Sequence, residues 1–331
     1  MSQIGIDVSN EVFDVSMVSD HGPVRRQFHN TPAGHRSFIC WALRHAKSTR
    51  ICMEATGIYH LQLALKLHRH PNIELMLVNP CAARRFVQAH MVRAKTDAID
   101  ADGLLLFLQR MPFHPWSAPP EQVLQLQSLT HRMTQLDKEI TRERCRLHAA
   151  RKAGPHTRLV QVDIKAHSKQ LERRLERIKR YAIDLVHDDA QLAEDARLID
   201  SAPGFAELSS TKLLAELATL PDDMMPAQWV AHAGLDPRAC ESGSSLRPPR
   251  HISKQGNVRI RAALYMPALV AAHRDPNVSA YYQALLARGK PKMVALTAVM
   301  RRLLHALWGM LHHRQVWDGD KFYRLQSPNI A

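Results

Sequence analysis

The segment Gly5-Ile6-Asp7-Val8-Ser9 places an aspartate at the end of an apolar run with the pattern of a β-strand. A second such run ends at Glu54, within Cys52-Met53-Glu54-Ala55-Thr56-Gly57. Asp97 and Asp100 follow in Lys95-Thr96-Asp97-Ala98-Ile99-Asp100, and their three-residue spacing puts both on one face of a helix. Strands that end in acids beside an acidic helix predict one acidic site in an α/β domain.

The predicted acidic site has the ligand chemistry of a hard divalent cation. Carboxylates without neighbouring His or Cys suit Mg²⁺ or Mn²⁺, so we expect Asp7, Glu54, Asp97 and Asp100 to bind such an ion. Metal sites of this kind cleave or transfer phosphodiesters. Asp102 adds another acid nearby, but a two-residue step on a helix turns it away, so the prediction favours Asp100 as the ligand.

The composition indicates a polyanionic partner. The chain has 331 residues and a formal net charge of +14, which favours nucleic acid over a merely solvated basic surface. Its five cysteines form no Cys-x-x-Cys pair, as expected in a reducing compartment without zinc or disulfides. No signal peptide or run of eighteen apolar residues is recognised. We therefore expect a cytoplasmic, nucleoid-associated protein with no membrane partner.

The N-terminal third has the pattern of an α/β domain. Strands are expected at 3–9, 12–18, 25–29, 50–54 and 74–78, and helices at about 31–46, 59–70, 81–90 and 97–110. Three hairpin-like strands followed by alternating helices and strands predict a mixed sheet over residues 1–115. Prolines between 112 and 120 mark a linker to the next domain.

The middle of the chain has a heptad pattern over residues 116–196. The apolar positions are Leu126, Leu129, Met133, Leu136, Ile140 and Leu147, then Val160, Ile164, Leu171, Leu175, Ile178, Ala182 and Leu185. Their spacing predicts an antiparallel, coiled-coil helical hairpin. Because two helices alone rarely bury enough surface, an oligomer contact is favoured over packing within one chain. Residues 197–331 are expected to form a mostly α-helical domain.

A second candidate site is the serine-rich stretch Glu241-Ser242-Gly243-Ser244-Ser245. Its composition is also typical of a plain linker. The surrounding cations favour a functional role, because a hydroxyl beside guanidinium groups could contact a phosphate or attack it. The residues expected to bind nucleic acid are Arg238, Arg247, Arg250, Lys254, Arg259 and Arg261, with Lys290 and Lys292 before a long C-terminal helix.

These motifs occur together, and in this order, in a known family. Over residues 3–312 the chain resembles insertion-sequence transposases of the family numbered one hundred and ten, the DEDD, RuvC-like transposases described as bridge-RNA-guided recombinases. The motifs that carry the resemblance are Gly5–Ser9, Glu54–Gly57, Asn79-Pro80, Lys95–Ala101, Glu241–Ser245 and Arg261–Ala268.

The resemblance carries expectations about fold and site. It implies a RuvC-like RNase H fold for the first domain and a C-terminal transposase domain for the third. It implies that Asp7, Glu54, Asp97 and Asp100 are the metal-binding quartet, and that Ser242 is the nucleophile that becomes joined to DNA. The family turn Pro-Gly-x-Gly reads Pro203-Gly204-Phe205-Ala206 here, which is a departure.

The resemblance also implies partners. It implies a tetramer built from two dimers, in which the quartet of one protomer lies beside the serine of another. It further implies a noncoding bridge RNA that pairs with donor and target DNA. The favoured function is therefore that of an insertion-sequence transposase, a metal-dependent DNA recombinase with a covalent protein–DNA intermediate.

Three other functions stay open at this point. A metal-dependent RuvC-like endonuclease or junction resolvase would use water as the nucleophile and form no covalent adduct. A catalytically silent nucleic-acid-binding protein would need no quartet. A sugar kinase also starts with Gly-x-Asp-x-Ser, but no later glycine-rich phosphate loop follows it.

Overall fold

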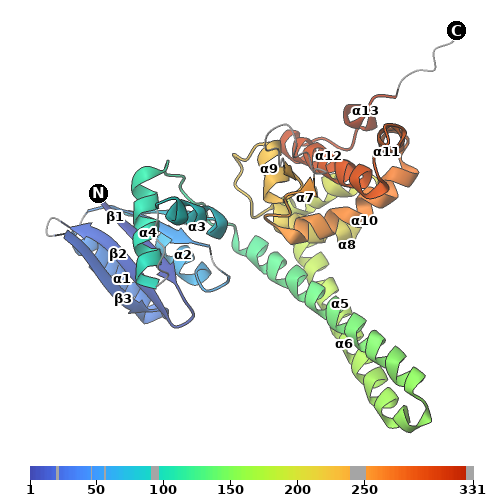
Figure 1. Cartoon of the computed structure of the whole chain (residues 1–331), viewed down its shortest axis with the longest axis horizontal. Coiled ribbons are helices and arrows are strands. Elements are labelled where there is room, and N and C mark those ends of the chain that lie inside the picture. The colour runs from blue at the N-terminus through green and yellow to red at the C-terminus, as the bar shows by residue number, and fades with distance from the viewer. Residues whose placement is uncertain (20–21, 46, 56, 91–96, 239–250, 326–331) are drawn as a thin grey trace, which may run out of the picture. The chain divides into compact units, whose positions relative to one another are not determined.

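The computed structural model describes residues 1–19, 22–45, 47–55, 57–90, 97–238 and 251–325 (Figure 1). The chain divides into two compact units, Met1–Ala118 and Pro119–Ala331. Each unit has hydrophobic clusters of its own. The helical hairpin falls within the second unit, and a separate domain beginning at residue 197 stays a prediction.

The first unit contains one five-stranded mixed sheet. Its strands are β1 (Ser2–Val8), β2 (Val12–Ser19), β3 (Gly22–His29), β4 (Thr49–Glu54) and β5 (Ile73–Val78), in the order β3-β2-β1-β4-β5. The pairs β1–β2 and β2–β3 are antiparallel, whereas β1–β4 and β4–β5 are parallel. The predicted mixed sheet is confirmed.

Helices cover both faces of this sheet. One face packs against α1 (Pro32–His45) and α2 (Leu61–His68), and the other against α3 (Pro80–Ala89) and α4 (Asp97–Arg110). Ile4, Ile6 and Val8 of β1 are buried in the α1–α2 cluster. Because side chains alternate along a strand, Gly5 and Asp7 belong to the opposite face, which α4 covers. An α/β first unit is confirmed, and the RuvC-like fold stays a prediction.

The second unit begins with two long helices that lie side by side (Figure 1). They are α5 (Glu121–Ala153) and α6 (Arg158–Asp188), joined by the 3₁₀ turn Pro155–Thr157. The predicted seam is buried along its middle, at Leu126, Met133, Leu136, Ile140, Ile164, Leu171, Leu175 and Ala182. Val160 was expected there wrongly: it is 54% exposed, because it stands beside the turn where the pairing begins. Supercoiling of the pair stays a prediction.

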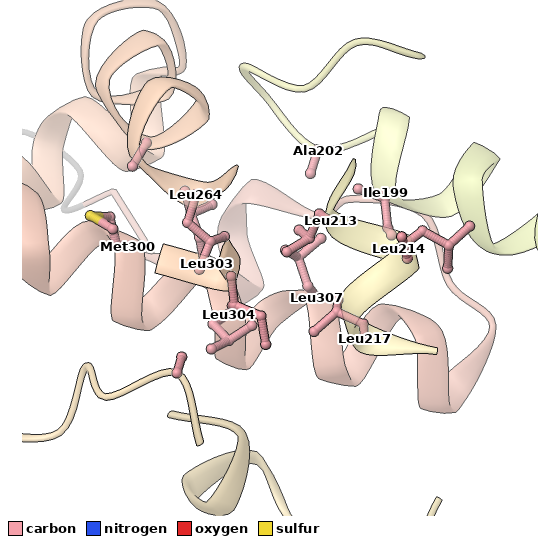
Figure 2. Close-up of a cluster of buried hydrophobic side chains, with 14 of the residues drawn as sticks. Ile199, Ala202, Leu213, Leu214, Leu217, Leu264, Met300, Leu303, Leu304 and Leu307 are labelled. Atoms are coloured by element: carbon pink, nitrogen blue, oxygen red, sulfur yellow. The ribbon is translucent and has the colours of Figure 1, made fainter. Parts of the chain in front are cut away.

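The rest of the second unit is a helical bundle with one short ribbon. It comprises α7 (Ala190–Asp200), α8 (Glu207–Leu217), α9 (Pro226–His232), α10 (Val258–Arg274), α11 (Pro276–Ala287), α12 (Lys292–His313), α13 (Gly319–Phe322), β6 (Pro237–Arg238) and β7 (His251–Ile252). Figure 2 shows leucines of α8 and α12 pointing toward one another in the core, among them Leu213, Leu217, Leu303 and Leu307. The expected mostly helical C-terminal part is confirmed.

Helix α12 lies in this core. By length and hydropathy it could cross a membrane, yet one face of the helix is buried against the other helices of the unit. Leu303, Leu304 and Leu307 are each fully buried. The apolar composition of α12 is therefore explained by its place in the bundle.

The glycine that this chain shares with the family turn, Gly204, lies against α10. Gly204 has a φ of +86°, and a Cβ added there would lie 2.2 Å from the carbonyl oxygen of Pro267. Only glycine allows this backbone approach. The turn is thus a packing element between α7 and α8.

Candidate functional site

Asp7 and Glu54 stand at the ends of neighbouring parallel strands. The register pairs Ile6 with Met53, and Asp7 and Glu54 are the next residues in β1 and β4. Burial, and then the charge of Glu54, raise the pKa of the Cys52 thiol to about 12. Cys52 belongs to the α3–α4 cluster, so Glu54, two residues later, belongs to that face as well. Both acids therefore share the face covered by α4.

Helix α4 approaches β1 at Gly5 more closely than any side chain would permit. A Cβ on Gly5 would lie 2.2 Å from the carbonyl oxygen of Ala101 and 2.4 Å from the amide nitrogen of Leu105. Asp100 precedes Ala101, and Asp7 is two residues beyond Gly5. The glycine thus brings the acidic start of α4 to the strand that carries Asp7.

Asp102 has partners of its own on β2 and β3. Ser16 Oγ donates a hydrogen bond of 2.5 Å to Asp102 Oδ1, and Arg25 Nε donates one of 3.2 Å to the same oxygen. A second nitrogen of the Arg25 guanidinium forms an ion pair with Oδ2, and these contacts raise the pKa of Arg25. Asp102 is therefore committed to an ion pair, in keeping with the preference for Asp100.

The donor set of this face suits a hard cation. Asp7, Glu54 and Asp100 offer only carboxylate oxygens, which are the ligands that hard divalent cations prefer. Among the described side chains no three His, Cys, Asp or Glu converge on one ion position, and the side chain of Asp97 lies outside them. The chemistry fits Mg²⁺ or Mn²⁺, and the complete ligand set stays a prediction.

Asp14 is a further carboxylate on this face that the sequence reasoning missed. It is the cross-strand partner of Asp7, and Gln27 Nε2 donates to its two oxygens at 3.1 and 3.3 Å. Directly opposed residues on antiparallel strands point to the same face. The signal in the sequence was an acid within a mostly apolar strand, two residues before Ser16.

A polar clamp holds the chain after both strand-end acids. Asn30 Nδ2 donates to the carbonyl oxygens of Ser9 at 2.9 Å and Tyr59 at 3.2 Å. Since that nitrogen is the donor, Asn30 Oδ1 must accept the 2.8 Å hydrogen bond from His35 Nε2. His35 is buried, and burial together with the charge of Lys66 lowers its pKa. The clamp joins the segments that follow Asp7 and Glu54, and no motif in the sequence predicted it.

Ser242 and two of the expected cations, Arg247 and Arg250, fall in 239–250, outside the described residues. The flanks of this stretch are described: Arg238 of β6 is the cross-strand partner of His251 of β7. The Ser242 stretch therefore departs from, and returns to, a two-stranded ribbon.

The other expected nucleic-acid contacts differ in exposure. Arg238, Lys254, Arg259, Lys290 and Lys292 are exposed. Arg261 is half-buried, and its Nη1 donates a 2.7 Å hydrogen bond to the carbonyl oxygen of Ala233 at the end of α9. Arg261 thus connects α10 to the end of α9, next to the residues that lead into the ribbon.

Comparison with known proteins identifies the family. A model of the DEDD domain of IS110 elements, described as "Transposase", matches residues 4–152, and one described as "Transposase IS116/IS110/IS902 family" matches residues 196–283. The pilin gene-inverting protein of Moraxella bovis is 23% identical over 323 residues, which cover 95% of this chain and 97% of that protein.

Two insertion-element proteins match a smaller part of the chain. An uncharacterized 43.6 kDa protein of IS110 from Streptomyces coelicolor is 28% identical over 131 residues, or 40% of this chain and 31% of that protein. An uncharacterized 42 kDa protein of IS900 from Mycobacterium paratuberculosis is 32% identical over 126 residues, which cover 37% of this chain and 31% of that protein.

The two family models fall on the parts of the chain that carry the candidate residues. The first spans Asp7, Glu54 and Asp100, and the second spans Ser242 with its flanking ribbon. The resemblance seen in the sequence is confirmed by both models and by the insertion-element relatives. The chain therefore belongs to the IS116/IS110/IS902 family of transposases, which are enzymes that recombine DNA.

Proposed function

We propose that this transposase is a metal-dependent serine recombinase that exchanges DNA strands through a covalent protein–DNA link. The observation that carries the proposal is the shared face of Asp7, Glu54 and Asp100, in a chain that also contains the Ser242 stretch. Similarity to a pilin gene-inverting protein along nearly the whole chain supports site-specific exchange of DNA.

The proposed reaction keeps the number of phosphodiester bonds constant. The oxygen of Ser242 attacks phosphorus and gives up its proton, the bond from phosphorus to one deoxyribose oxygen breaks, and that oxygen leaves as a hydroxyl. A DNA hydroxyl of the other duplex then attacks the phosphoserine, which releases the serine and joins the strands. Because the serine ester retains the phosphodiester bond energy, rejoining needs no external energy source.

The acidic residues would serve the same phosphate. Asp7, Glu54, Asp97 and Asp100 would hold Mg²⁺ or Mn²⁺, which when bound supplies positive charge to polarise the scissile phosphate. Arg238, Lys254 and Arg259 are exposed near the ends of the Ser242 stretch and would hold the DNA backbone. Arg247, Arg250, Lys290 and Lys292 would extend this contact.

We further propose the partners that the family resemblance implies. These are donor and target DNA, a noncoding bridge RNA, and other copies of the chain in a dimer of dimers. The net charge of +14 supports nucleic-acid partners in the nucleoid of the cytoplasm. Three domains, 1–115, 116–196 and 197–331, would then divide metal binding, oligomerisation and the serine step among them.

The tip of the α5–α6 hairpin supports the oligomer. Leu159, Val160 and Val162 are 85%, 54% and 58% exposed, although each is apolar. Replacing Leu159 and Val162 with Glu should reduce the molar mass measured by light scattering, because charge prevents their burial. An unchanged oligomer would place the contact elsewhere.

The decisive test of the serine mechanism is covalent attachment. We expect protein incubated with Mg²⁺, copurified RNA and DNA carrying its element ends to yield a Ser242–DNA peptide, identified by mass spectrometry after denaturation. Ser242→Ala should abolish the adduct, and Ser244→Ala, two residues away, should retain it. Cut DNA without an adduct would favour a water-using nuclease, and neither product would favour a silent binding protein.

The metal requirement has its own control. Asp7→Asn should abolish the adduct while DNA binding persists, because the carboxylate serves the reaction and not affinity. Glu74→Gln removes an exposed carboxylate of the same unit that pairs with Arg50 at 2.7 Å, and it should leave the reaction intact. Full activity of Asp7→Asn would exclude this residue from the site.

A further inference from the structure

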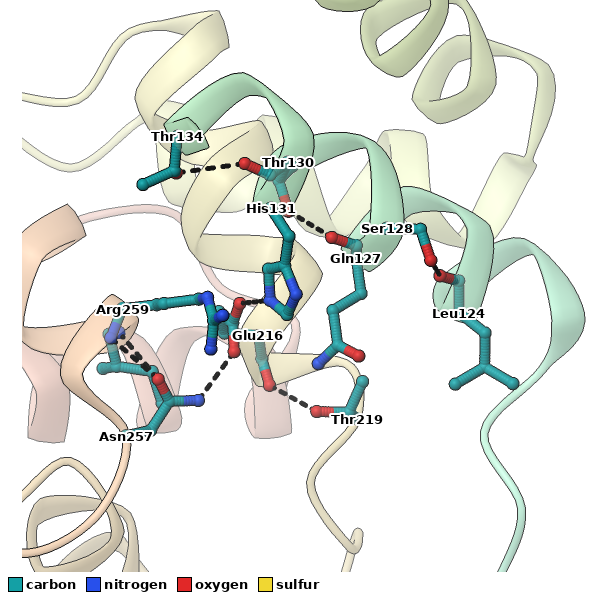
Figure 3. Close-up of polar contacts among 11 residues, drawn as sticks. Leu124, Gln127, Ser128, Thr130, His131, Thr134, Glu216, Thr219, Asn257 and Arg259 are labelled. Carbon is teal, nitrogen blue, oxygen red and sulfur yellow. Dashed lines mark hydrogen bonds and ion pairs between the residues drawn. The ribbon is translucent and has the colours of Figure 1, made fainter. Parts of the chain in front are cut away.

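A nearly fully buried carboxylate lies where the hairpin meets the helical bundle. Glu216 of α8 is 2% exposed, and its two oxygens have different partners (Figure 3). His131 Nε2, on α5, lies 2.6 Å from Oε1, and Asn257 Nδ2 donates to Oε2 at 2.6 Å. One side chain thus connects the hairpin to the residue that caps the N-terminus of α10.

The cap that Asn257 forms on α10 determines which way its side-chain amide points. Its Oδ1 caps α10 by accepting from the amide nitrogens of Arg259 at 2.8 Å and Ile260 at 3.3 Å. The amide nitrogen of the side chain must therefore point the other way, toward Glu216. Only a hydrogen-bond acceptor at position 216 satisfies it.

Asn257 also completes the support of the β6–β7 ribbon. Its backbone amide nitrogen donates to the carbonyl oxygen of His232 at 2.6 Å, and Ser253 Oγ donates to Asp236 Oδ1 at 2.5 Å. A Cβ on Gly256 would lie 2.1 Å from the same His232 oxygen, so the return segment is packed against the end of α9. We call residues 232–238 and 251–257 the serine stem, because the Ser242 stretch lies between them.

The charge of Glu216 is retained despite its burial. Burial alone would raise the pKa of Glu216, but the hydrogen bonds from His131 and Asn257 and the charge of Arg259 outweigh it, so the pKa is lowered. A buried ionised group is a poor source of stability compared with a well-packed apolar side chain. Its presence at this junction is better explained by the geometry that its two hydrogen bonds impose.

We infer that Glu216 is a positioning residue for Ser242, which fixes the serine stem through Asn257 and ties that stem to the hairpin through His131. The inference rests on the proposed role of Ser242 and deepens it. The stem supports both ends of the segment that carries Ser242, and displacing the support of a reacting group by an ångström costs about a hundredfold in rate.

An exchange of two groups tests this role. Glu216→Gln keeps the side-chain volume but leaves one acceptor oxygen where two are used, so its NH₂ faces either Asn257 or His131. Asn257→Asp sets a second carboxylate against Glu216. The double variant E216Q/N257D restores the hydrogen bond with its direction reversed, because the new amide at position 216 donates and the new carboxylate at position 257 accepts. That carboxylate can still cap α10, and the carbonyl oxygen of the new amide can still accept from His131.

Two readouts are measured on the full-length protein with its nucleic acids. Hydrogen exchange of 251–262 reports on the stem, and the initial rate of Ser242–DNA adduct formation reports on positioning. In both single variants, the amides of 251–262 should exchange faster than in the wild type. Both should form the adduct about 10- to 100-fold more slowly, with DNA binding unchanged. The double variant should recover both, and thermal unfolding shows whether every variant is folded.

Two results would overturn the inference. One is a result in which both single variants, Asn257→Asp included, keep the stem exchange and the adduct rate of the wild type. The other is a double variant that regains thermal stability but not the adduct rate. Failure of the serine mechanism looks different: the wild type forms no adduct, and stem exchange alone then decides whether Glu216 holds the stem.

Discussion

At the scale of single residues, the role of a carboxylate depends on the donors around it. Asp102 is neutralised by Arg25 and bound by Ser16, so its oxygens are occupied. Asp100, two residues earlier, lies at the turn of α4 that meets Gly5. Asp102 therefore has a structural role in holding α4 to β2 and β3, and Asp100 stays the proposed metal-binding residue.

The separation of these two acids is testable by matched amide variants. Asp100→Asn should abolish adduct formation with little change in Tm, because the loss of a metal ligand affects the reaction more than the packing of α4. Asp102→Asn should lower Tm by a few degrees, because it weakens the contacts with Ser16 and Arg25, while activity persists. The opposite pattern would assign the metal to Asp102.

His35 makes the stability of the first unit depend on pH. Its folded-state pKa is lowered below the ordinary value of 6.5 by burial and by Lys66, so the folded state binds fewer protons than the unfolded state below that pH. Stability should therefore be constant above about pH 6.5 and fall as the pH drops toward the folded pKa.

Chemical denaturation between about pH 5 and pH 7.5 measures this dependence. His35→Gln retains a donor for Asn30 and removes the titration, so its stability should vary less over this range. His29→Gln, at an exposed histidine of the same unit, serves as the control and should follow the wild type. If the stability of His35→Gln depended on pH as steeply as that of the wild type, His35 would be excluded as the cause.

At the scale of elements, the packing of α4 on β1 assembles the proposed metal site. The helix backbone lies against Gly5 without any intervening side chain, and Leu104 and Leu108 anchor the same helix in a hydrophobic cluster. Strand ends supply Asp7 and Glu54, and this helix supplies Asp100. The site therefore depends on one backbone-to-backbone approach.

Adding one methyl group at that approach should displace the helix. Gly5→Ala should lower the free energy of unfolding by about 2 kcal/mol and abolish adduct formation, because α4 must move away from β1. Gly309→Ala in α12 is the matched control, since its Cβ would meet no atom within 4 Å and alanine is the better helix former. Urea denaturation compares the two, and a stable, active Gly5→Ala would contradict the proposed packing.

At the scale of the whole molecule, the positive charge is the property that matters for nucleic acid. The net charge of +14 is spread over exposed side chains, among them Lys290 and Lys292 at the start of α12. Cations that contact phosphates release counterions when they bind. Cations that are already paired with a carboxylate release fewer counterions when nucleic acid binds.

The salt dependence of binding separates these two kinds of cation. Replacing Lys290 and Lys292 with Ala should make the slope of log affinity against log salt shallower by about 2, because two phosphate contacts are lost. Lys179→Ala should leave the slope unchanged, since Lys179 pairs with Glu176 at 2.7 Å. Filter binding at several salt concentrations gives both slopes, and equal slopes would remove Lys290 and Lys292 from the interface.

Local pattern was enough for the sequence to predict the strands and helices of the first unit and the two hairpin helices. Apolar runs and the turn residues between them marked the five strands, and 3–4 spacing marked the two hairpin helices, because each signal depends only on residues a few positions apart. The ordered motifs around Asp7, Glu54, Asp100 and Ser242 were enough to predict the family. Val160 was placed wrongly because periodicity says nothing about where a seam ends.

Contacts between distant segments were decided only by the tertiary structure. Register sets Asp14 opposite Asp7, packing brings Ala101 onto Gly5, and the bundle buries Glu216 between His131 and Asn257. None of these has a local signal, because a hydrogen bond or a van der Waals contact depends on distance in space. The sequence by itself thus determined the elements of the first unit, the hairpin, the family and the candidate residues, and the tertiary structure decided which residues meet.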